Sequence, residues 1–336
     1  MTEESQSPAQ VSAGPRFIVV AGGINLDMVV RTARLPARGE TIHGRELVQV
    51  PGGKGANQAA AVARLGGAAR LLAVVGDDAA GTLLLDSVRA DGVDARWVRT
   101  APGEPSGVAL IAVADDGGNT IIVAPGANAR ADAATIAEAS AAFSDAAVVM
   151  GQLEWPFAAV EALLAQAPTG AIRLLNAAPA ERRALALLPL VDWLIVNESE
   201  ASLLAGAEVC DQESVVQAAE QLRQLRVGGA IVTLGGRGAV LVGPTGAWFQ
   251  PAPQVSVVDT TAAGDAFAGA FAVALAEGAP LQAALRFAVA AGSLACTVLG
   301  ARPSLPRRDA VDRFLSEVPT VQRLAESKLI HGEPGG

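Results

Sequence analysis

Residues 257–270 read VVDTTAAGDAFAGA, which is the end of an apolar strand, a turn of small residues and the start of a helix at Asp265. Small side chains leave the backbone N–H groups of this turn open at the positive end of the helix. Such a turn can hold an anion, or negative charge that develops during a reaction. The stretch therefore predicts a strand–turn–helix unit with an anion site at the carboxyl end of a strand.

Asp265 is the reactive side chain of this turn. It can act as a base on a hydroxyl group whose oxygen lies beside the anion. The alternative is that Asp265 only caps the helix, a role that stabilises a helix by about 1 kcal/mol. The preceding Asp259 and the small residues of the turn give the reactive role as much support as the capping role.

Outside this stretch, apolar strand-like runs alternate with helical runs rich in Ala and Leu. The predicted strands are 17–21, 70–75, 147–150, 172–176, 193–196, 230–234 and 239–242. The predicted helices include 57–65, 79–90, 156–166, 198–205, 214–225 and 265–276. Continuous apolar strands separated by helices predict an α/β fold whose parallel sheet is covered on both faces.

Three segments interrupt this alternation, namely 26–31, 41–50 and 107–123. Each alternates β-branched residues with others and has no helix after it. Within the last one, Asp115-Asp116-Gly117-Gly118-Asn119 joins two strand-like runs and predicts a hairpin. We therefore expect strands outside the main sheet that form a small β lid or an interface.

A second glycine turn enters a helix at residues 52–59, GGKGANQA. It is not a Walker A loop, because Gly55 follows the lysine where Ser or Thr is needed. Lys54 is the only lysine in the first 327 residues, so a role as a compact donor and that of a solvated turn lysine are both open.

Polar side chains also follow several predicted strands. Asn25 and Asp27 alternate on an extended segment and so point the same way, which suits sugar hydroxyls, although an Asx turn is the simpler alternative. Further polar runs lie at 151–154, 197–200 and 233–238. At one edge of the sheet they would form a nucleotide cleft.

Composition excludes several classes of protein. The 336 residues carry a net charge of −9, so neither a nucleic acid nor an anionic membrane is an expected partner. Two His and two Cys residues supply neither a zinc cluster nor a disulfide framework, so acid–base chemistry falls to carboxylates and a cytoplasmic location is expected. Residues 1–15 are polar and do not predict a signal peptide.

The motifs DTTAAGDAFAGA and GGKGANQA resemble the two signatures of the ribokinase-like carbohydrate kinases. The resemblance runs from Phe17 to Pro306. The other shared features are Asn25-x-Asp27, Gly39-Glu40-Thr41, Gly76-Asp77-Asp78, Ser106 to Leu110, Gly126 to Ala129, Gln152-Leu153-Glu154 and Gly300 to Ser304. This resemblance implies a three-layer α/β/α fold with a mainly parallel central sheet and a small lid. The kinase domain would span residues 16–318, with lid strands at about 24–32, 40–50 and 107–125 and loose tails at 1–15 and 320–336.

By this resemblance, the protein transfers the γ-phosphoryl group of ATP to the 5-hydroxyl of D-ribose. Asp265 would be the catalytic base, and Ala262, Ala263 and Gly264 the anion hole. The implied sugar-binding residues are Asn25, Asp27, Gly53, Lys54, Gly55, Ala56, Asn57, Glu154 and Asp265. The implied nucleotide-binding residues are Asn197, Glu200, Thr233, Leu234, Gly235, Gly236, Arg237, Gly238, Gly264 and Asp265.

The same resemblance implies two cations and a partner. Mg²⁺ would come with ATP, and the Asn197-x-x-Glu200 motif would help to place it. K⁺ would activate the enzyme from a site made by Asp259, Thr261, Ala295, Val298, Gly300 and Ser304. The lid strands would pair two copies into a homodimer. Val289 departs from the His or Asn that the family often carries near the adenine.

Alternatives remain at this point. A kinase of the same fold could act on 2-deoxyribose, fructose or a nucleoside. A non-catalytic sugar sensor is a different class, but it has no reason to keep Asp265 and the anion hole. A nicotinamide dehydrogenase lacks support, because no GxGxxG follows the first strand.

Overall fold

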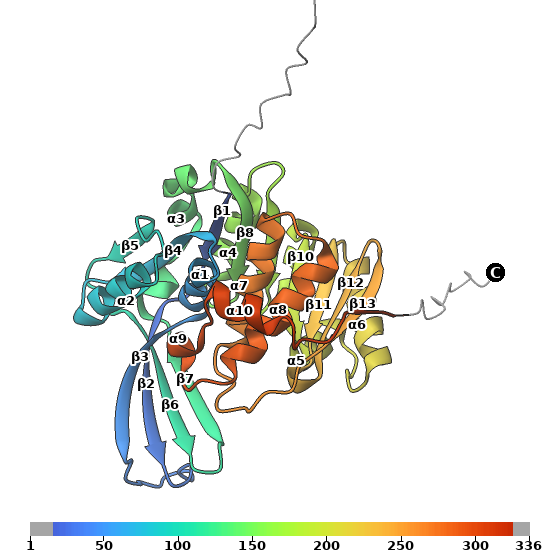
Figure 1. The fold of residues 1–336 in the computed structure, drawn as a ribbon. Helices are drawn as coiled ribbons and strands as arrows, with labels where there is room; N and C mark the ends of the chain where they lie inside the picture. Colours follow the sequence, from blue (N-terminus) through green and yellow to red (C-terminus); the bar gives the residue numbers. More distant parts are fainter. Residues whose placement is uncertain (1–15, 325–336) are drawn as a thin grey trace, which may run out of the picture.

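The computed structural model of the chain describes residues 16–324. A ten-stranded sheet forms its body, in the order β14-β13-β12-β11-β10-β9-β8-β1-β4-β5 (Figure 1). Neighbouring strands from β11 to β5 run parallel, and β12, β13 and β14 add antiparallel strands at one edge. The strands are β1 (Phe17–Ala21), β4 (Ala68–Gly76), β5 (Val98–Ala101), β8 (Ala146–Gln152), β9 (Ile172–Asn176), β10 (Trp193–Asn197), β11 (Gly229–Thr233), β12 (Gly238–Gly243), β13 (Gly246–Pro251) and β14 (Gln322–Arg323).

Both faces of this sheet are buried. In β1, Ile18 and Val20 belong to one apolar cluster, and Val19 and Ala21 belong to another. Successive side chains of a strand point to opposite faces, so each cluster lies on its own side of the sheet. This explains why the strands read as continuous apolar runs, and it confirms the predicted α/β fold.

Helices cover the two faces and complete three layers (Figure 1). One face packs against α1 (Lys54–Arg64), α2 (Ala79–Ala90), α7 (Ala263–Ala276), α8 (Leu281–Ala295) and α10 (Arg308–Phe314). The other packs against α3 (Ala133–Glu138), α4 (Phe157–Gln166), α5 (Glu198–Ala205) and α6 (Gln212–Gln224). Shorter elements are α9 (Ala301–Ser304) and the 3₁₀ segments η1 (Gly126–Arg130), η2 (Ser140–Phe143), η3 (Arg182–Leu190) and η4 (Gly235–Arg237).

A separate four-stranded sheet, which we call the lid, extends from the body (Figure 1). It consists of β2 (Asn25–Thr32), β3 (Glu46–Gly52), β6 (Gly107–Ala114) and β7 (Asn119–Ala124), in the order β3-β2-β6-β7. Strands β6 and β7 form the expected hairpin. The sequence-based expectation of strands outside the main sheet is therefore confirmed.

Two of the differences from the sequence-based prediction concern the lid and the end of the chain. Residues 40–45 are not a strand, and β3 begins only at Glu46. Gly39, with a φ of 81°, and an Arg34–Glu40 ion pair shape a turn before it. Residues 322–323, expected in a loose tail, pair with β13 as β14. The expected tails at 1–15 and 325–336 lie outside the described residues.

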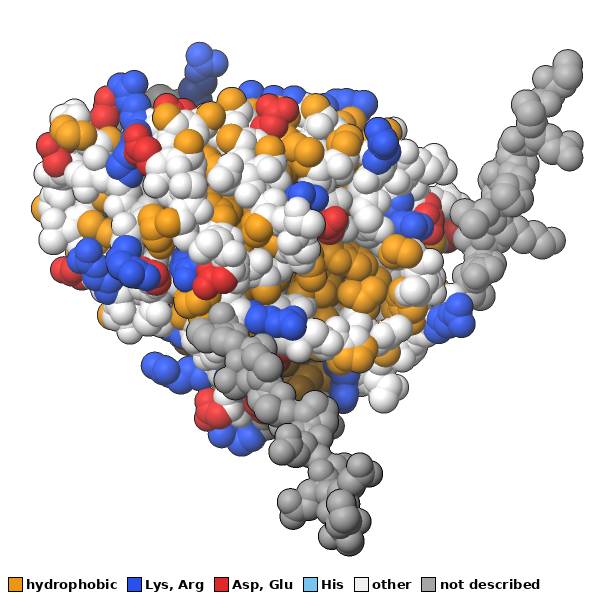
Figure 2. Space-filling view, turned by 90° about the horizontal axis from the view of Figure 1, so that it is seen from above, with side chains coloured by type: hydrophobic (Ala, Val, Ile, Leu, Met, Phe, Trp, Pro, Cys, Tyr) orange, Lys and Arg blue, Asp and Glu red, His pale blue; other side chains and the backbone are white. Residues whose placement is uncertain are grey.

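Two observations concern the nucleic-acid and membrane partners that the sequence analysis does not expect. On the part of the described surface that Figure 2 shows, basic side chains lie among acidic and hydrophobic ones and make no continuous basic patch. Within residues 16–324, no helix is both long enough and apolar enough to cross a membrane.

Candidate active site

Asp265 lies in the first turn of α7, and its side chain does not cap the helix. The capping position is Ala262, whose φ of 60° is left-handed, and no side chain caps this end. Asp265 is only 6% exposed, and its carboxylate points to α1 instead. Asn57 Nδ2 donates to Oδ2 at 3.0 Å, and Gln58 Nε2 donates to Oδ1 at 3.0 Å. The alternative that Asp265 serves only as a helix cap is therefore wrong.

The strand predicted before this turn is absent, because residues 252–258 form no strand and Val257 and Val258 are exposed. The turn of small residues is present and leads directly into α7, which begins at Ala263. The N–H of Ala263 donates to the carbonyl of Thr260 at 3.2 Å, and the first helical hydrogen bond is that of Ala266 to Ala262. The N–H groups of Gly264 and Asp265 lie before that first helical bond, where a helix supplies no partner. A Cβ added to Gly264 would meet no atom within 4 Å, so the space beside the turn is open.

The start of α1 is brought to the same place by a close backbone contact. Gly53 precedes the helix with a φ of 89°, and a Cβ there would lie 2.6 Å from the carbonyl oxygen of Gly23. Only glycine fits both the angle and the space. The N–H of Lys54 then donates to Glu154 Oε2 at 2.8 Å. Gly55 and Ala56 follow in the first turn, and the N–H of Ala56 donates to the carbonyl of Gly23.

Charges of both signs converge here. Burial opposes the charge on Lys54, but Asp265, Glu154 and Glu200 outweigh it and raise the pKa of the ammonium. Burial also raises the pKa of Glu154 and of Asp265, and Lys54 opposes both shifts. Lys54 is therefore not a solvated turn lysine, because it neutralises part of a buried acidic cluster.

Asp27 belongs to this cluster. Burial, followed by the charges of Glu154 and Asp265, raises the pKa of Asp27 from 3.8 to about 7, and Arg302 opposes the shift. A Cβ on Gly52, across the strand pair β2–β3, would lie 2.1 Å from the Asp27 carboxylate. Asn25 also lies at the start of β2 and is buried, where its Oδ1 accepts a hydrogen bond from Asn128 Nδ2 at 2.9 Å.

A second group of predicted residues lies at the ends of β10 and β11. Asn197 and Thr233 are register partners in these parallel strands. Asn197 and Glu200 form a capping box at the start of α5, in which each side chain accepts the other residue's N–H. The charge of Glu200 acts on Lys54, so this edge adjoins the acidic cluster.

The loop after β11 contains the remaining residues of that group. Gly235, Gly236 and Arg237 form η4, and Gly238, with a φ of 115°, begins β12. Arg237 forms an ion pair with Glu198 of α5, and Leu234 is buried.

The arrangement joins a buried carboxylate, a lysine and an open anion turn at the carboxyl edge of a parallel sheet. The sequence pattern described as "pfkB family carbohydrate kinase" matches residues 15–308. The chain belongs to this family of carbohydrate kinases. It is therefore a phosphotransferase.

Two ribokinases align with this kinase over nearly their whole length. It is 34% identical to a ribokinase of Haemophilus influenzae over 301 residues, which is 89% of this chain and 98% of that protein. It is 38% identical to a ribokinase of Schizosaccharomyces pombe over 306 residues, 88% of this chain and 96% of that one. The solved structure of an Arabidopsis thaliana ribokinase complexed with ribose and ATP has a TM-score of 0.81 at 34% identity, covering 90% and 99% of the two chains.

In this kinase, the residues of the predicted monovalent-cation site come from the loop before α7 and from the segment that runs from the end of α8 through α9. Asp259 Oδ1 accepts hydrogen bonds from the N–H and hydroxyl of Thr261 at 2.9 and 2.6 Å, and Oδ2 accepts the N–H of Gly300 at 2.8 Å. These bonds lower the pKa of Asp259, although burial opposes them. Ser304 Oγ lies 3.5 Å from the carbonyl oxygen of Thr261.

The other members of that set are less closely gathered. The carbonyl of Ala295 accepts the N–H of Val298 at 3.5 Å, and Val298 is 44% exposed. Among residues 16–324, no group of three or more His, Cys, Asp and Glu side chains is placed to hold a metal ion. A cation here would rely on backbone carbonyl and hydroxyl oxygens around Asp259, which are hard donors suited to an alkali ion.

Three buried residues of the site were not predicted. Gln58 contacts Asp265 directly, Asn128 contacts Asn25, and Arg302 Nε donates to Asn57 Oδ1 at 3.2 Å. All three lie inside motifs that the sequence analysis quotes, but nothing in sequence spacing shows that they face the site. Val289, where the family often has a polar residue, is buried in α8.

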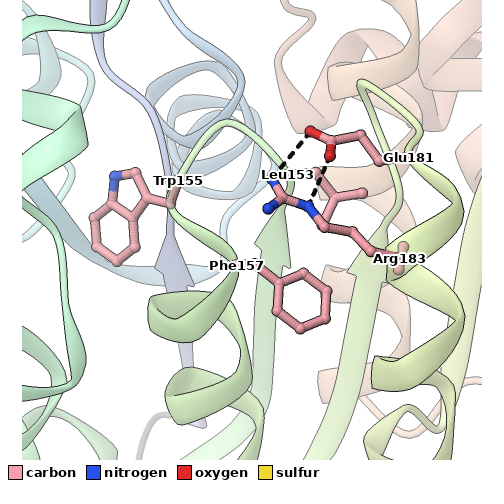
Figure 3. Close-up of a pocket in the computed structure, with 6 residues that line it drawn as sticks. Leu153, Trp155, Phe157, Glu181 and Arg183 are labelled. Carbon is pink, nitrogen blue, oxygen red and sulfur yellow. Dashed lines mark hydrogen bonds and ion pairs between the residues drawn. The ribbon is translucent and has the colours of Figure 1, made fainter.

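A small pocket is lined in part by the residues on either side of Glu154 in the sequence (Figure 3). Leu153, Trp155 and Phe157 line it, together with Arg183 and Glu181, whose Nε and Oε2 atoms are 2.7 Å apart. Among the described residues, those that line it include no predicted site residue.

Proposed function

We propose that this kinase transfers the γ-phosphoryl group of ATP to the 5-hydroxyl of D-ribose. The observation that carries the proposal is the position of Asp265, a buried carboxylate in the first turn of α7 beside Lys54, Asn57, Asp27 and Glu154. The names of the relatives at 34% and 38% identity support ribose as the sugar and ATP as the donor. Phosphoryl transfer relies on positioning and charge stabilisation, which such a site supplies without His or Cys.

In this proposal Asp265 accepts the proton of the sugar hydroxyl. A carboxylate has about four acceptor positions, and the two amides of α1 occupy one on each oxygen. Each oxygen therefore keeps a position for the hydroxyl. The open N–H groups of Gly264 and Asp265, with the Ala262-Ala263-Gly264 turn, take the developing charge of the transferring phosphoryl group.

The sugar lies between β2 and the start of α1 in this arrangement. Its hydroxyls are bound by Asn25, Asp27, Lys54, Asn57 and Glu154, which offer both donors and acceptors. The close backbone contacts at Gly53, Gly55 and Ala56 support the proposal, since they hold the start of α1 against the loop at Gly23. The lid extends from this region and would exclude water, so that the sugar rather than water receives the phosphoryl group.

ATP lies along the carboxyl ends of β10 and β11, where Asn197, Thr233 and η4 lie close together. Asn197 and Glu200 offer oxygen atoms of the kind Mg²⁺ prefers, and Mg²⁺ would shield the charge of the phosphates. Arg237 could leave its exposed ion pair with Glu198 for a phosphate, because an exposed pair contributes little stability.

We extend the proposal to K⁺ and to a dimer. A cation bound near Asp259 would steady the turn that leads to the anion hole. The lid supports the dimer, because all six residues of its edge strand β7 are exposed and Ile122 is 62% exposed. An apolar edge strand of this kind needs a partner to prevent nonspecific pairing.

The test is the release of ADP from ATP, Mg²⁺ and K⁺ with D-ribose, 2-deoxyribose, fructose, adenosine or no sugar. A rate confined to ribose supports the proposal. A site that hydrogen-bonds a hydroxyl rejects a substrate that lacks it, so 2-deoxyribose is expected to react far more slowly. Preference for another compound would overturn the sugar assignment and leave the base untouched. Asp265→Asn should lower kcat by about 10²–10⁴-fold.

A further inference from the structure

Asp265 is held from both of its oxygens by neighbouring side chains of α1. Gln58 reaches Oδ1, and Asn57 reaches Oδ2, each at 3.0 Å. Gln58 is fully buried, so it cannot contact a substrate in the open site. Any effect of Gln58 on the reaction must therefore act through the groups that it contacts.

The orientation of the Gln58 amide follows from its neighbours. Asn176 Nδ2 donates to the carbonyl of Ile195 at 3.2 Å, so Asn176 turns its Oδ1 to Gln58. Gln58 Nε2 donates to this oxygen at 3.0 Å and to the Asp265 carboxylate, and both of these can only accept. Gln58 Oε1 is left to accept from Gln152 Nε2 at 2.6 Å.

These hydrogen bonds attach Asp265 to the central sheet. Gln152 ends β8, Asn176 ends β9 and Ile195 lies in β10. A Cβ on Gly22 would lie 1.9 Å from Gln152 Oε1, so a glycine leaves the space that this chain of amides needs. The Oδ1 side of the carboxylate is thus connected through Gln58 to three parallel strands.

The other oxygen of Asp265 is held by a similar chain. Arg302 is 4% exposed, forms an ion pair with Asp91, and donates from Nε to Asn57 Oδ1. That contact fixes the Asn57 amide so that its Nδ2 faces Asp265. Asn57 belongs to the proposed sugar site, so Gln58 offers the cleaner test of what this support does.

We propose that Gln58 is a positioning residue for phosphoryl transfer, which aims the Asp265 carboxylate at the sugar hydroxyl and stabilises its ionised form. The proposal rests on the proposed function of Asp265 as the base. A hydrogen bond to a charged group is among the stronger ones, and a buried donor keeps that strength.

Other charges also act on Asp265. Burial raises its pKa, while Lys54 of α1 and Arg302 of α9 lower it. Asp27 of β2 and Glu154, which follows β8, add negative charge close by. Gln58 differs from these groups because it stays neutral at every pH tested, so removing it shifts the titration of Asp265 without adding a titration of its own.

The experiment measures kcat/KM and kcat for the sugar against pH in the Gln58→Met variant, which keeps the length of the side chain and removes the amide. The acidic limb of kcat at saturating sugar, which is free of the pH dependence of sugar binding, is expected to move up by about one pH unit, since one hydrogen bond to the carboxylate is lost. At the pH optimum, kcat should fall about tenfold. KM for the sugar should stay unchanged, because Gln58 is buried away from the substrate.

Gln250→Met is the matched control. Gln250 is also fully buried, and its Nε2 donates to the carbonyls of Pro251 and Pro319 at 2.9 Å, at the other edge of the sheet. It should lose stability like Gln58→Met, measured by thermal unfolding, and keep the wild-type pH profile. A shift of the acidic limb in both variants would overturn the proposal, because the effect would then follow stability alone.

Two further variants keep the test decisive. If Gln58→Met does not fold, Gln152→Met removes the hydrogen bond that Gln58 Oε1 accepts. This variant should shift the acidic limb of the pH profile in the same direction by a smaller amount. An unshifted limb in whichever variant folds refutes the positioning role. Asp265→Asn separates the two proposals: if it retains full activity, the base assignment fails, and if it is inactive while Gln58→Met keeps the wild-type profile, only the positioning role fails.

Discussion

Sugar binding should depend on pH near neutrality because of Asp27. Its pKa is raised to about 7 by burial, with further contributions from Glu154 and Asp265. Sugar hydroxyls donate hydrogen bonds, and they bind an ionised carboxylate more strongly than a protonated one. With a pKa near 7, the ionised fraction of Asp27 rises from about one tenth at pH 6 to about nine tenths at pH 8. The dissociation constant of ribose should therefore fall about tenfold over this range.

Calorimetric titration of ribose without ATP measures this effect apart from the chemical step. At pH 7, binding should release about half a proton, seen as a difference in heat between buffers of different ionisation enthalpy. Asp27→Asn is the control, because it should bind more weakly and lose the pH dependence. A dissociation constant that is constant from pH 6 to 8, or a pH dependence that survives in Asp27→Asn, would refute this reasoning.

The same shift has a consequence for folding. In the unfolded chain the pKa of Asp27 returns to about 3.8, so the folded protein binds the extra proton between that value and about 7. Stability must then fall as pH rises through this window and level off above it. Asp27→Asn should remove that part of the pH dependence of unfolding.

Three other predictions follow from the site and the lid. K⁺ should raise kcat through the Asp259 loop, and Asp259→Ala should remove the response; equal rates in K⁺, Na⁺ and tetramethylammonium would contradict the cation site. Gly53→Ala should lower the free energy of unfolding by about 1–3 kcal/mol and impair sugar binding, because the added Cβ would lie 2.6 Å from a backbone oxygen. Gly66→Ala is the control: it also has a positive φ, of 88°, but no atom lies within 4 Å of the added Cβ, so sugar binding should stay intact. Ile122→Lys should shift a dimer to monomers in sedimentation, while Leu83→Lys, on the exposed face of α2, should not; a sedimentation profile unchanged by Ile122→Lys would exclude the lid as the contact.

Much of the fold was predictable because its signals are local. The strands of the main sheet are buried on both faces and read as apolar runs, and β1, β9 and β10 appear close to their predicted bounds. The lid was recognisable from alternation without following helices. The strands β5, β13 and β14 were missed: β5 and β14 are short and only partly apolar, and β13 contains Gly, Gln and Pro.

The boundary error in β3 has a similar cause. Thr41 and Ile42 are β-branched, which favours a strand, yet they follow the turn at residues 37–40 and have no regular structure. Pairing with β2 begins only at Glu46, so the partner strand rather than local propensity sets where β3 starts.

Residue types and short spacings in the sequence already identify the two small-residue turns, the carboxylate of Asp265, and Lys54 as the only lysine in the first 327 residues. The turns are recognisable because a helix start with small residues leaves its backbone N–H groups accessible wherever the helix lies in the fold. The support of Asp265 by Gln58, Gln152 and Arg302 does not follow from spacing, because these residues lie on α1, β8 and α9 and meet only when the layers pack. The shift of Asp27 has the same origin: burial and neighbouring charges act through space, and distance along the chain carries no information about them.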